Sequence, residues 1–156
     1  MTVVSNLTPF RIPDAAEVEK ASFSSPWKAN ALREELNSPF ANYFCVTVDG
    51  RLVGYGGFLS LSGEGEITRI AVLPEFRRKG LAAMLMHRLM TRAAELNIGA
   101  MFLEVRESNA PAISLYQKFG FEKVGLRPDY YTLPKEAAVL MSADVSKYTL
   151  LQKDKV

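Results

Sequence analysis

The spacing of apolar residues along the chain changes several times, and each change marks a different predicted element. Residues 81–96 predict a long helix, because apolar positions recur there at helical spacing: Leu81, Leu85, Leu89, Ala93 and Leu96. AMFLEV (residues 100–105) is apolar almost throughout, which is typical of a buried central strand. Residues 42–61 hold two apolar strands around Asp49-Gly50, a strong signal for a two-residue hairpin.

Capping and turn signals place the remaining elements. Asp14, with Glu17 three residues on, predicts the start of a helix. Asn109 stands at the N-cap position of another helix. The other predicted segments are a short second helix at 24–39, a third strand at 66–72, the capped helix at 108–120 and two closing strands at 121–133 and 136–145. The order is helix, helix, three strands, helix, strand, helix and two strands, which predicts a mixed α/β sheet that begins as an antiparallel meander.

Composition excludes several classes of protein. The 156 residues suit one domain, and a net charge of +2 is too small to indicate nucleic-acid binding. The one cysteine, Cys45, excludes an internal disulfide and a cysteine-rich metal site, so we expect a buried thiol and no metal. The one histidine, His87, falls on the polar face of its helix and is assigned no role.

The sequence contains no clear signal for membrane insertion, secretion or a domain boundary. No apolar run approaches the roughly 18 residues of a membrane helix, and the N-terminus does not read as a secretion signal. We therefore expect a cytoplasmic protein with no membrane contact. The absence of repeats and linkers predicts a single domain over residues 1–146, followed by a tail at 147–156 that is disordered or contacts a partner.

RRKGLA (residues 77–82) joins the third predicted strand to the long helix. Its glycine allows a tight turn with exposed N–H groups, and the helix start adds unpaired N–H groups and the positive end of the dipole. Basic residues oppose that dipole, so stability alone explains three of them poorly. The pattern favours an anion site that suits a pyrophosphate, and a basic helix start without a ligand is the alternative. It matches neither a dinucleotide fingerprint nor a Walker loop.

Two longer segments carry a resemblance to a known family. Residues 67–86 (ITRIAVLPEFRRKGLAAMLM), followed by residues 101–125 (MFLEVRESNAPAISLYQKFGFEKVG), are similar to the acetyl-coenzyme A binding core of the GNAT superfamily of N-acetyltransferases. The loop matches the superfamily pattern at Arg77, Gly80 and Ala82. Within the superfamily the chain looks most like the ribosomal-protein-alanine N-acetyltransferases, through SSPW, LEVRESNAPAISLY, FGF and LRPDYY, over nearly its whole length to about Asp144.

The resemblance implies a fold and a cofactor site. The implied fold is α/β (α+β), with a mixed, mostly antiparallel sheet of six to seven strands and about four flanking helices. Backbone groups of Ile70, Ala71 and Val72 would line the pantetheine arm and polarise the thioester carbonyl. Asn109 would hydrogen-bond the pantetheine. The pyrophosphate would be bound or attracted by Arg77, Arg78, Lys79, Gly80, Leu81, Ala82 and Ala83.

The resemblance also implies Glu104 as general base and Tyr116 as general acid. A carboxylate can take the proton of an α-amine, whose pKa is about 7.7–8.0, and a phenol can protonate the departing thiolate. Each residue has a structural alternative. Glu104 could be an ordinary charge at a strand end, Asn109 only a cap, and Tyr116 a core tyrosine. Tyr130 and Tyr131 either shape the acceptor entrance or only pack.

The implied reaction is acetyl transfer from acetyl-coenzyme A to the N-terminal alanine of a small-subunit ribosomal protein, by a monomer or weak dimer without direct nucleic-acid contact. One alternative is another amine: a protein lysine, a polyamine or an aminoglycoside. A second is a non-enzymatic acetyl-coenzyme A sensor or partner subunit. Two features depart from the subgroup and could border the acceptor site: Arg69 stands where asparagine is common, and TLPKEA (residues 132–137) is a short connection.

Overall fold

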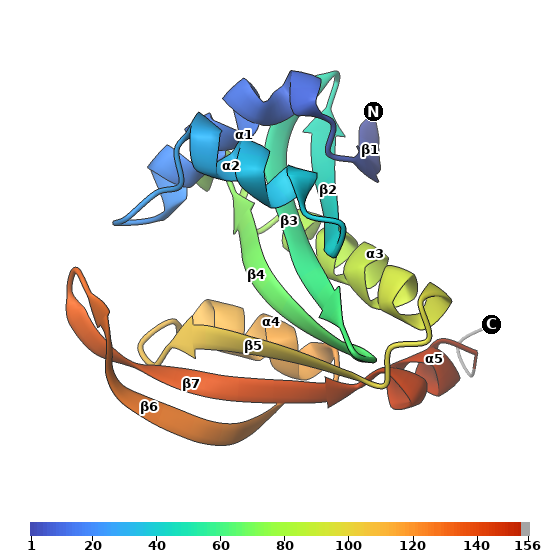
Figure 1. Cartoon of the computed structure of the whole chain (residues 1–156). Helices are drawn as coiled ribbons and strands as arrows, with labels where there is room; N and C mark the ends of the chain where they lie inside the picture. Colours follow the sequence, from blue (N-terminus) through green and yellow to red (C-terminus); the bar gives the residue numbers. More distant parts are fainter. Residues whose placement is uncertain (154–156) are drawn as a thin grey trace. The chain divides into compact units, whose positions relative to one another are not determined.

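The computed structural model describes residues 1–153, which form a seven-stranded mixed sheet with α-helices and the strand order β1-β2-β3-β4-β5-β7-β6 (Figure 1). The strands are β1 (Thr2–Asn6), β2 (Ala41–Val48), β3 (Arg51–Leu61), β4 (Glu64–Val72), β5 (Ala100–Arg106), β6 (Glu122–Thr132) and β7 (Lys135–Asp144). The α-helices are α1 (Ile12–Ser22), α2 (Ala29–Asn37), α3 (Leu81–Glu95), α4 (Ala110–Lys118) and α5 (Val145–Lys153), and two short 3-10 turns lie at Pro9–Arg11 and Pro74–Phe76. No helix within residues 1–153 has the length and apolar character needed to span a membrane.

The chain forms two compact units. Unit 1 contains residues 1–59 and 68–89, and unit 2 contains residues 60–67 together with those from Met90 onward. The strand β4 and the helix α3 each contribute to both units. The expected single-domain boundary near residue 146 stays a prediction.

Unit 1 is an antiparallel meander with two helices packed together. β1 pairs with β2, and β2 pairs with β3 around the Asp49-Gly50 turn, where both residues have positive φ, as a two-residue hairpin requires. Figure 1 shows α1 and α2 side by side over β2 and β3. The buried residues of this unit include Ile12, Val18, Leu32, Phe44, Val46, Tyr55, Phe58, Leu85 and Leu89.

Gly57 in β3 is required by the position of the Tyr43 ring. A Cβ added at Gly57 would lie 2.3 Å from Cδ1 of Tyr43, whose side chain is buried and hydrogen-bonded. We expect Gly57→Ala to lower the free energy of unfolding by about 1–3 kcal/mol, because the ring must move. Urea unfolding measures this, with Gly99→Ala as the control, since a Cβ at Gly99 meets nothing within 4 Å. Equal stability of the two variants would contradict the packing described here.

Unit 2 is built on β5, which pairs with β7, while β7 also pairs with β6 at the edge of the sheet. β4 and β5 run parallel over Glu64–Glu66 and Ala100–Phe102. The pairing of β6 with β7 shifts register twice, between Lys123 and Gly125 and again between Arg127 and Tyr131. The buried residues of this unit include Met101, Leu103, Val105, Phe121, Val139, Met141 and Tyr148.

The predicted fold class is confirmed, and the structure corrects several boundaries. It adds the strand β1 and the helix α5, so residues 147–153 of the expected tail are helical, and residues 154–156 lie outside the described part. α1 begins at Ile12 rather than Asp14, whose carboxylate pairs with Arg11. Residues 23–28 precede α2 instead of joining it. Pro26 lies in this segment, and the residue before a proline is disfavoured in a helix.

Candidate active site

The end of β4 and the start of α3 place the predicted cofactor residues other than Asn109 within unit 1. Ile70, Ala71 and Val72 are the last residues of β4. The Arg77 side chain returns to this strand and donates from Nε to the Val72 carbonyl at 2.9 Å. That contact gives Arg77 a structural role in addition to the expected attraction for phosphate, because it ties the cationic loop to the strand.

The loop between Arg77 and Leu81, the predicted anion site, has an unusual backbone. Arg78 and Gly80 both have positive φ, at 63° and 76°. The loop leads directly into α3, where Met84 N–H donates to the Gly80 carbonyl as the first bond of the helix. The preceding amides at the helix start have no partner within the helix, so they can donate to an anion. The Lys79 Nζ lies 5.4 Å from the ring centre of Phe76.

Gly80 offers a direct test of this loop. Its φ of 76° is unfavourable for a residue with a side chain, although a Cβ there would meet nothing within 4 Å. We expect Gly80→Ala to weaken acetyl-coenzyme A binding about fivefold or more, because the strained loop moves its amides. Isothermal titration measures the affinity. Gly50→Ala is the matched control, since Gly50 has a φ of 84° and the same open surroundings in the β2–β3 turn. An equal loss of affinity in both variants would contradict a specific role for the loop.

Glu104 lies in the central part of unit 2, on β5. Its side chain is 21% exposed, and its Oε1 lies 3.8 Å from Nη2 of Arg127 on β6. The other oxygen, Oε2, is buried and forms no hydrogen bond with any residue from 1 to 153. Leaving a buried carboxylate oxygen without a hydrogen-bond donor costs free energy. Because Oε2 has no donor, it can accept a proton or a hydrogen bond from a ligand.

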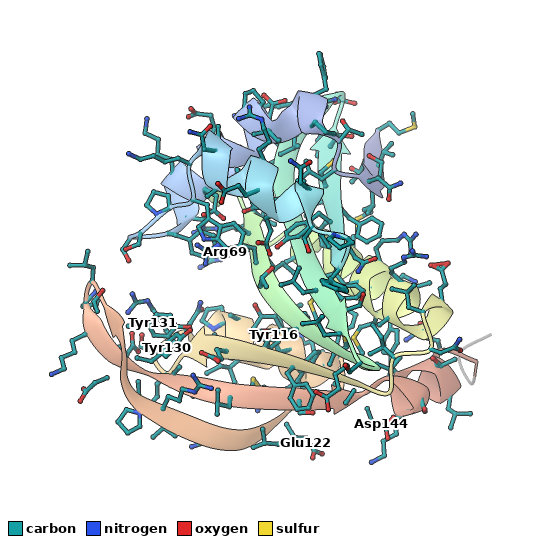
Figure 2. The ribbon with its side chains drawn as sticks, in the orientation of Figure 1. Arg69, Tyr116, Glu122, Tyr130, Tyr131 and Asp144 are labelled. Carbon is teal, nitrogen blue, oxygen red and sulfur yellow. The ribbon has the colours of Figure 1, made fainter. Side chains whose placement is uncertain are left out.

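Tyr130 is the aromatic neighbour of Glu104. Partial burial raises the pKa of Tyr130, and the nearby Glu104 carboxylate raises it further. The ring of Tyr130 meets that of Tyr131 edge to face at 5.0 Å (Figure 2). The two tyrosines therefore form a joined aromatic surface on β6, next to the carboxylate of Glu104.

Tyr116 on α4 is buried, as we expect if it is a tyrosine of the core. Its ring packs against Phe121 at 6.0 Å between ring centres. Burial raises the pKa of Tyr116, and the neighbouring Tyr131 adds to the increase, so its phenol stays protonated at neutral pH. Within residues 1–153 its hydroxyl has no hydrogen-bond partner. The hydroxyl of Tyr116 can therefore donate its proton to a ligand.

Asn109 is the N-cap of α4, as the sequence predicts, and its Oδ1 accepts the Ala112 N–H at 3.2 Å. The residue is exposed, and the amide NH₂ at the other end of the side chain can donate to a ligand at the same time. The capping role and the predicted pantetheine contact are therefore compatible.

Sequence reasoning missed a buried polar cluster in unit 1, centred on Glu19. The Glu19 side chain is fully buried, accepts the Trp27 N–H at 2.7 Å and the Tyr55 hydroxyl, and lies 3.1 Å from Nε of Arg69. The guanidinium of Arg69 lies 4.1 Å from the ring centre of Trp27 and 4.4 Å from that of Phe23. The available signal was position, because Glu19 falls four residues after the buried Ala15 on the apolar face of α1.

A second missed cluster holds the β6–β7 connection to the end of β5. Arg106 donates to the carbonyls of Pro134 at 2.8 Å and Leu133 at 3.2 Å, and its guanidinium lies 4.3 Å from the ring centre of Tyr131. Hydrogen bonds from Ser108 and, to a smaller extent, Arg106 lower the pKa of Glu136. The short TLPKEA connection is therefore fixed by Arg106, which the sequence alone does not indicate.

Comparison with known proteins identifies the family to which the chain belongs. The acetyltransferase (GNAT) family model matches residues 12–121, and together with the relatives below it shows that the chain is an acetyl-coenzyme A-dependent N-acetyltransferase. The chain belongs to the GNAT family, whose members use acetyl-coenzyme A.

Individual relatives cover most of the chain. The chain is 36% identical to the N-alpha-acetyltransferase RimI of Mycobacterium tuberculosis, over 83% of this chain and 84% of that protein. It is 29% identical to the ribosomal protein bS18-alanine N-acetyltransferase of Escherichia coli K12, over 94% and 99%. The crystal structure of the Escherichia coli ribosomal-protein-S18-alanine N-acetyltransferase superposes with a TM-score of 0.87 at 28% identity, covering 93% of this chain and 94% of that one.

Proposed function

We propose that this N-acetyltransferase acts on the N-terminal α-amine of a protein, and that its acceptor is an N-terminal alanine of a small-subunit ribosomal protein. The observation that supports this proposal is the similarity, over most of the chain, to one relative named for Nα-acetylation and to others named for the alanine of a ribosomal protein. A ribosomal protein acceptor would place the reaction in the cytoplasm.

The cofactor residues of unit 1 have separate tasks in this proposal. Bound acetyl-coenzyme A supplies the thioester. The backbone amides from Arg78 to Ala83 hold its pyrophosphate, with Lys79 adding attraction at longer range. The backbone of Ile70, Ala71 and Val72 lines the pantetheine arm, and an N–H there stabilises the charge that develops on the thioester oxygen. The NH₂ of Asn109 in unit 2 donates to the pantetheine.

The acid and base of unit 2 handle the protons. Glu104 takes the proton of the α-amine, directly or through water, because its Oε2 has no donor among the described residues. Tyr116 gives its proton to the departing thiolate. Its raised pKa means that the phenol carries this proton at neutral pH. No covalent intermediate with the enzyme is needed. The reaction is a direct transfer. The protonated amine loses two protons on becoming an amide, one to Glu104 before the attack and one as the tetrahedral intermediate collapses. The departing thiolate gains one from Tyr116, so one proton in all is released to solvent.

A panel of acceptors tests the proposed substrate. The purified protein is incubated with labelled acetyl-coenzyme A and with peptides that carry free N-terminal alanine, peptides with blocked N-termini and internal lysine, or spermidine. We expect label on the free alanine termini. Label on the lysine of a blocked peptide, with none on free termini, would contradict the proposal. Cofactor binding with no transfer to any acceptor would identify a sensor.

A further inference from the structure

Arg69 lies on β4, directly before the residues predicted to line the cofactor, and its guanidinium is held by an ion pair and two aromatic rings. Its Nε lies 3.1 Å from Oε2 of the fully buried Glu19, an ion pair without hydrogen-bond geometry, and its guanidinium carbon lies over the rings of Trp27 and Phe23. Figure 2 shows Arg69 beneath the connection between α1 and α2. An arginine held by a buried carboxylate and two aromatic rings loses little further freedom when it binds a ligand.

The outer nitrogens of this guanidinium are available. The ion pair with Glu19 is made at Nε, and neither Nη group donates a hydrogen bond to a residue within 1–153. The side chain is 21% exposed, so solvent or a ligand can reach it. The Nη groups present up to four N–H donors and no acceptor.

The position of Arg69 limits what those donors can meet. Arg69 directly precedes Ile70, and consecutive Cα atoms lie about 3.8 Å apart. In the proposed function the thioester lies along residues 70–72, and the attacking amine must come within about 3–3.5 Å of its carbon. An extended peptide advances about 3.3–3.6 Å per residue, so its first one or two carbonyls lie near the same stretch of β4.

We propose that Arg69 is a specificity-determining residue that donates from its Nη groups to the first or second main-chain carbonyl of the acceptor peptide. This inference rests on the proposed function and identifies how the site recognises a peptide terminus. Every peptide N-terminus carries these carbonyls one and two residues from the amine. A polyamine has none, and its charges are repelled by the guanidinium. The Glu19 pair and the aromatic rings set the position of Arg69, while the carbonyl contact selects the substrate.

The test compares a free N-terminal alanine peptide with two analogues in which a trans-alkene replaces the first or the second peptide bond. Each analogue keeps the shape and the amine but lacks one carbonyl. For the wild-type enzyme we expect kcat/KM to fall about ten- to hundredfold on one analogue, the range for a hydrogen bond to a charged group. Equal kcat/KM for the peptide and both analogues would overturn the inference without any variant.

Arg69→Lys completes the test, because lysine keeps the charge beside Glu19 but loses the planar fork of donors. We expect a loss of about tenfold or more on the peptide, no further loss on the sensitive analogue, and an unchanged KM for acetyl-coenzyme A. A uniform loss on all three acceptors would show a structural role only and overturn the inference. Arg51→Lys is the matched control, since Arg51 also lies near a ring, that of Phe76, and pairs with Glu75 at 3.4 Å.

The two proposals fail in different ways. Wild-type enzyme that acetylates lysine side chains or spermidine, and not peptide termini, would contradict the proposed function and this inference with it. Wild-type enzyme that acetylates peptide termini without distinguishing the alkene analogues would leave the proposed function standing and overturn the role of Arg69.

Discussion

Glu104→Gln is expected to lower kcat at neutral pH by about a hundred- to ten-thousandfold, the usual contribution of a general base. Glutamine keeps the size of the side chain and a hydrogen-bond acceptor, but it cannot take the proton of the amine. Steady-state rates with a free N-terminal alanine peptide measure the effect. Glu107→Gln is the control, because Glu107 is exposed three residues further along the chain, and we expect it to leave kcat unchanged.

The pH dependence separates a base from a structural carboxylate. An α-amine with a pKa of about 7.7–8.0 is mostly neutral above pH 9, where it needs less help to lose its proton. The deficit of Glu104→Gln should therefore shrink as pH rises from 7 to 9. A variant that keeps full activity at every pH would remove Glu104 from the mechanism.

Glu19→Ala is expected to lower the free energy of unfolding by about 3–5 kcal/mol, the largest stability effect that we predict. The change leaves the Arg69 guanidinium without its buried partner, and it deprives the Trp27 N–H and the Tyr55 hydroxyl of their acceptor. Urea unfolding measures the loss. Glu17→Ala is the matched control on the same helix, where the side chain is exposed and the expected change is within about 0.5 kcal/mol.

Glu19→Gln divides this effect between charge and hydrogen bonding. The amide oxygen of glutamine can still accept from Trp27 or Tyr55, but the ion pair with Arg69 is lost. We expect an intermediate loss of stability. If the alanine variant is as stable as the Glu17→Ala control, the buried ion pair described here does not contribute to folding.

Elements with a regular spacing of apolar residues, or with a specific turn or capping residue, could be predicted from the sequence. The Asp49-Gly50 hairpin, the helix from Leu81 and the Asn109 cap all lie where local chemistry places them. β1 was not predicted, because it is five residues long and none of them is buried, so it has no hydrophobic pattern. Pairing with β2 makes it a strand, and that interaction is not local in the sequence.

In the candidate site, too, local features could be predicted from the sequence and contacts between distant segments could not. The basic loop after β4 could be predicted from the sequence, because it combines a glycine with a helix start. The surroundings of Glu104 could not, since Arg127 lies on another strand and reaches the carboxylate only through the pairing of β6 with β7 and of β7 with β5. The partners of Arg69 are likewise distant in the sequence. The roles of Glu104, Tyr116, Asn109 and the loop residues stay predictions.

The irregular β6 has a consequence for solubility. As the last strand of the sheet it presents backbone groups that another extended chain could pair with. That edge is interrupted by two register shifts, by the proline at position 128 and by the charged residues around this proline. Without these interruptions the edge could pair with an extended peptide or with a second copy of the chain as an added strand. We therefore expect the register shifts of β6 to disfavour edge-to-edge pairing between copies of the chain.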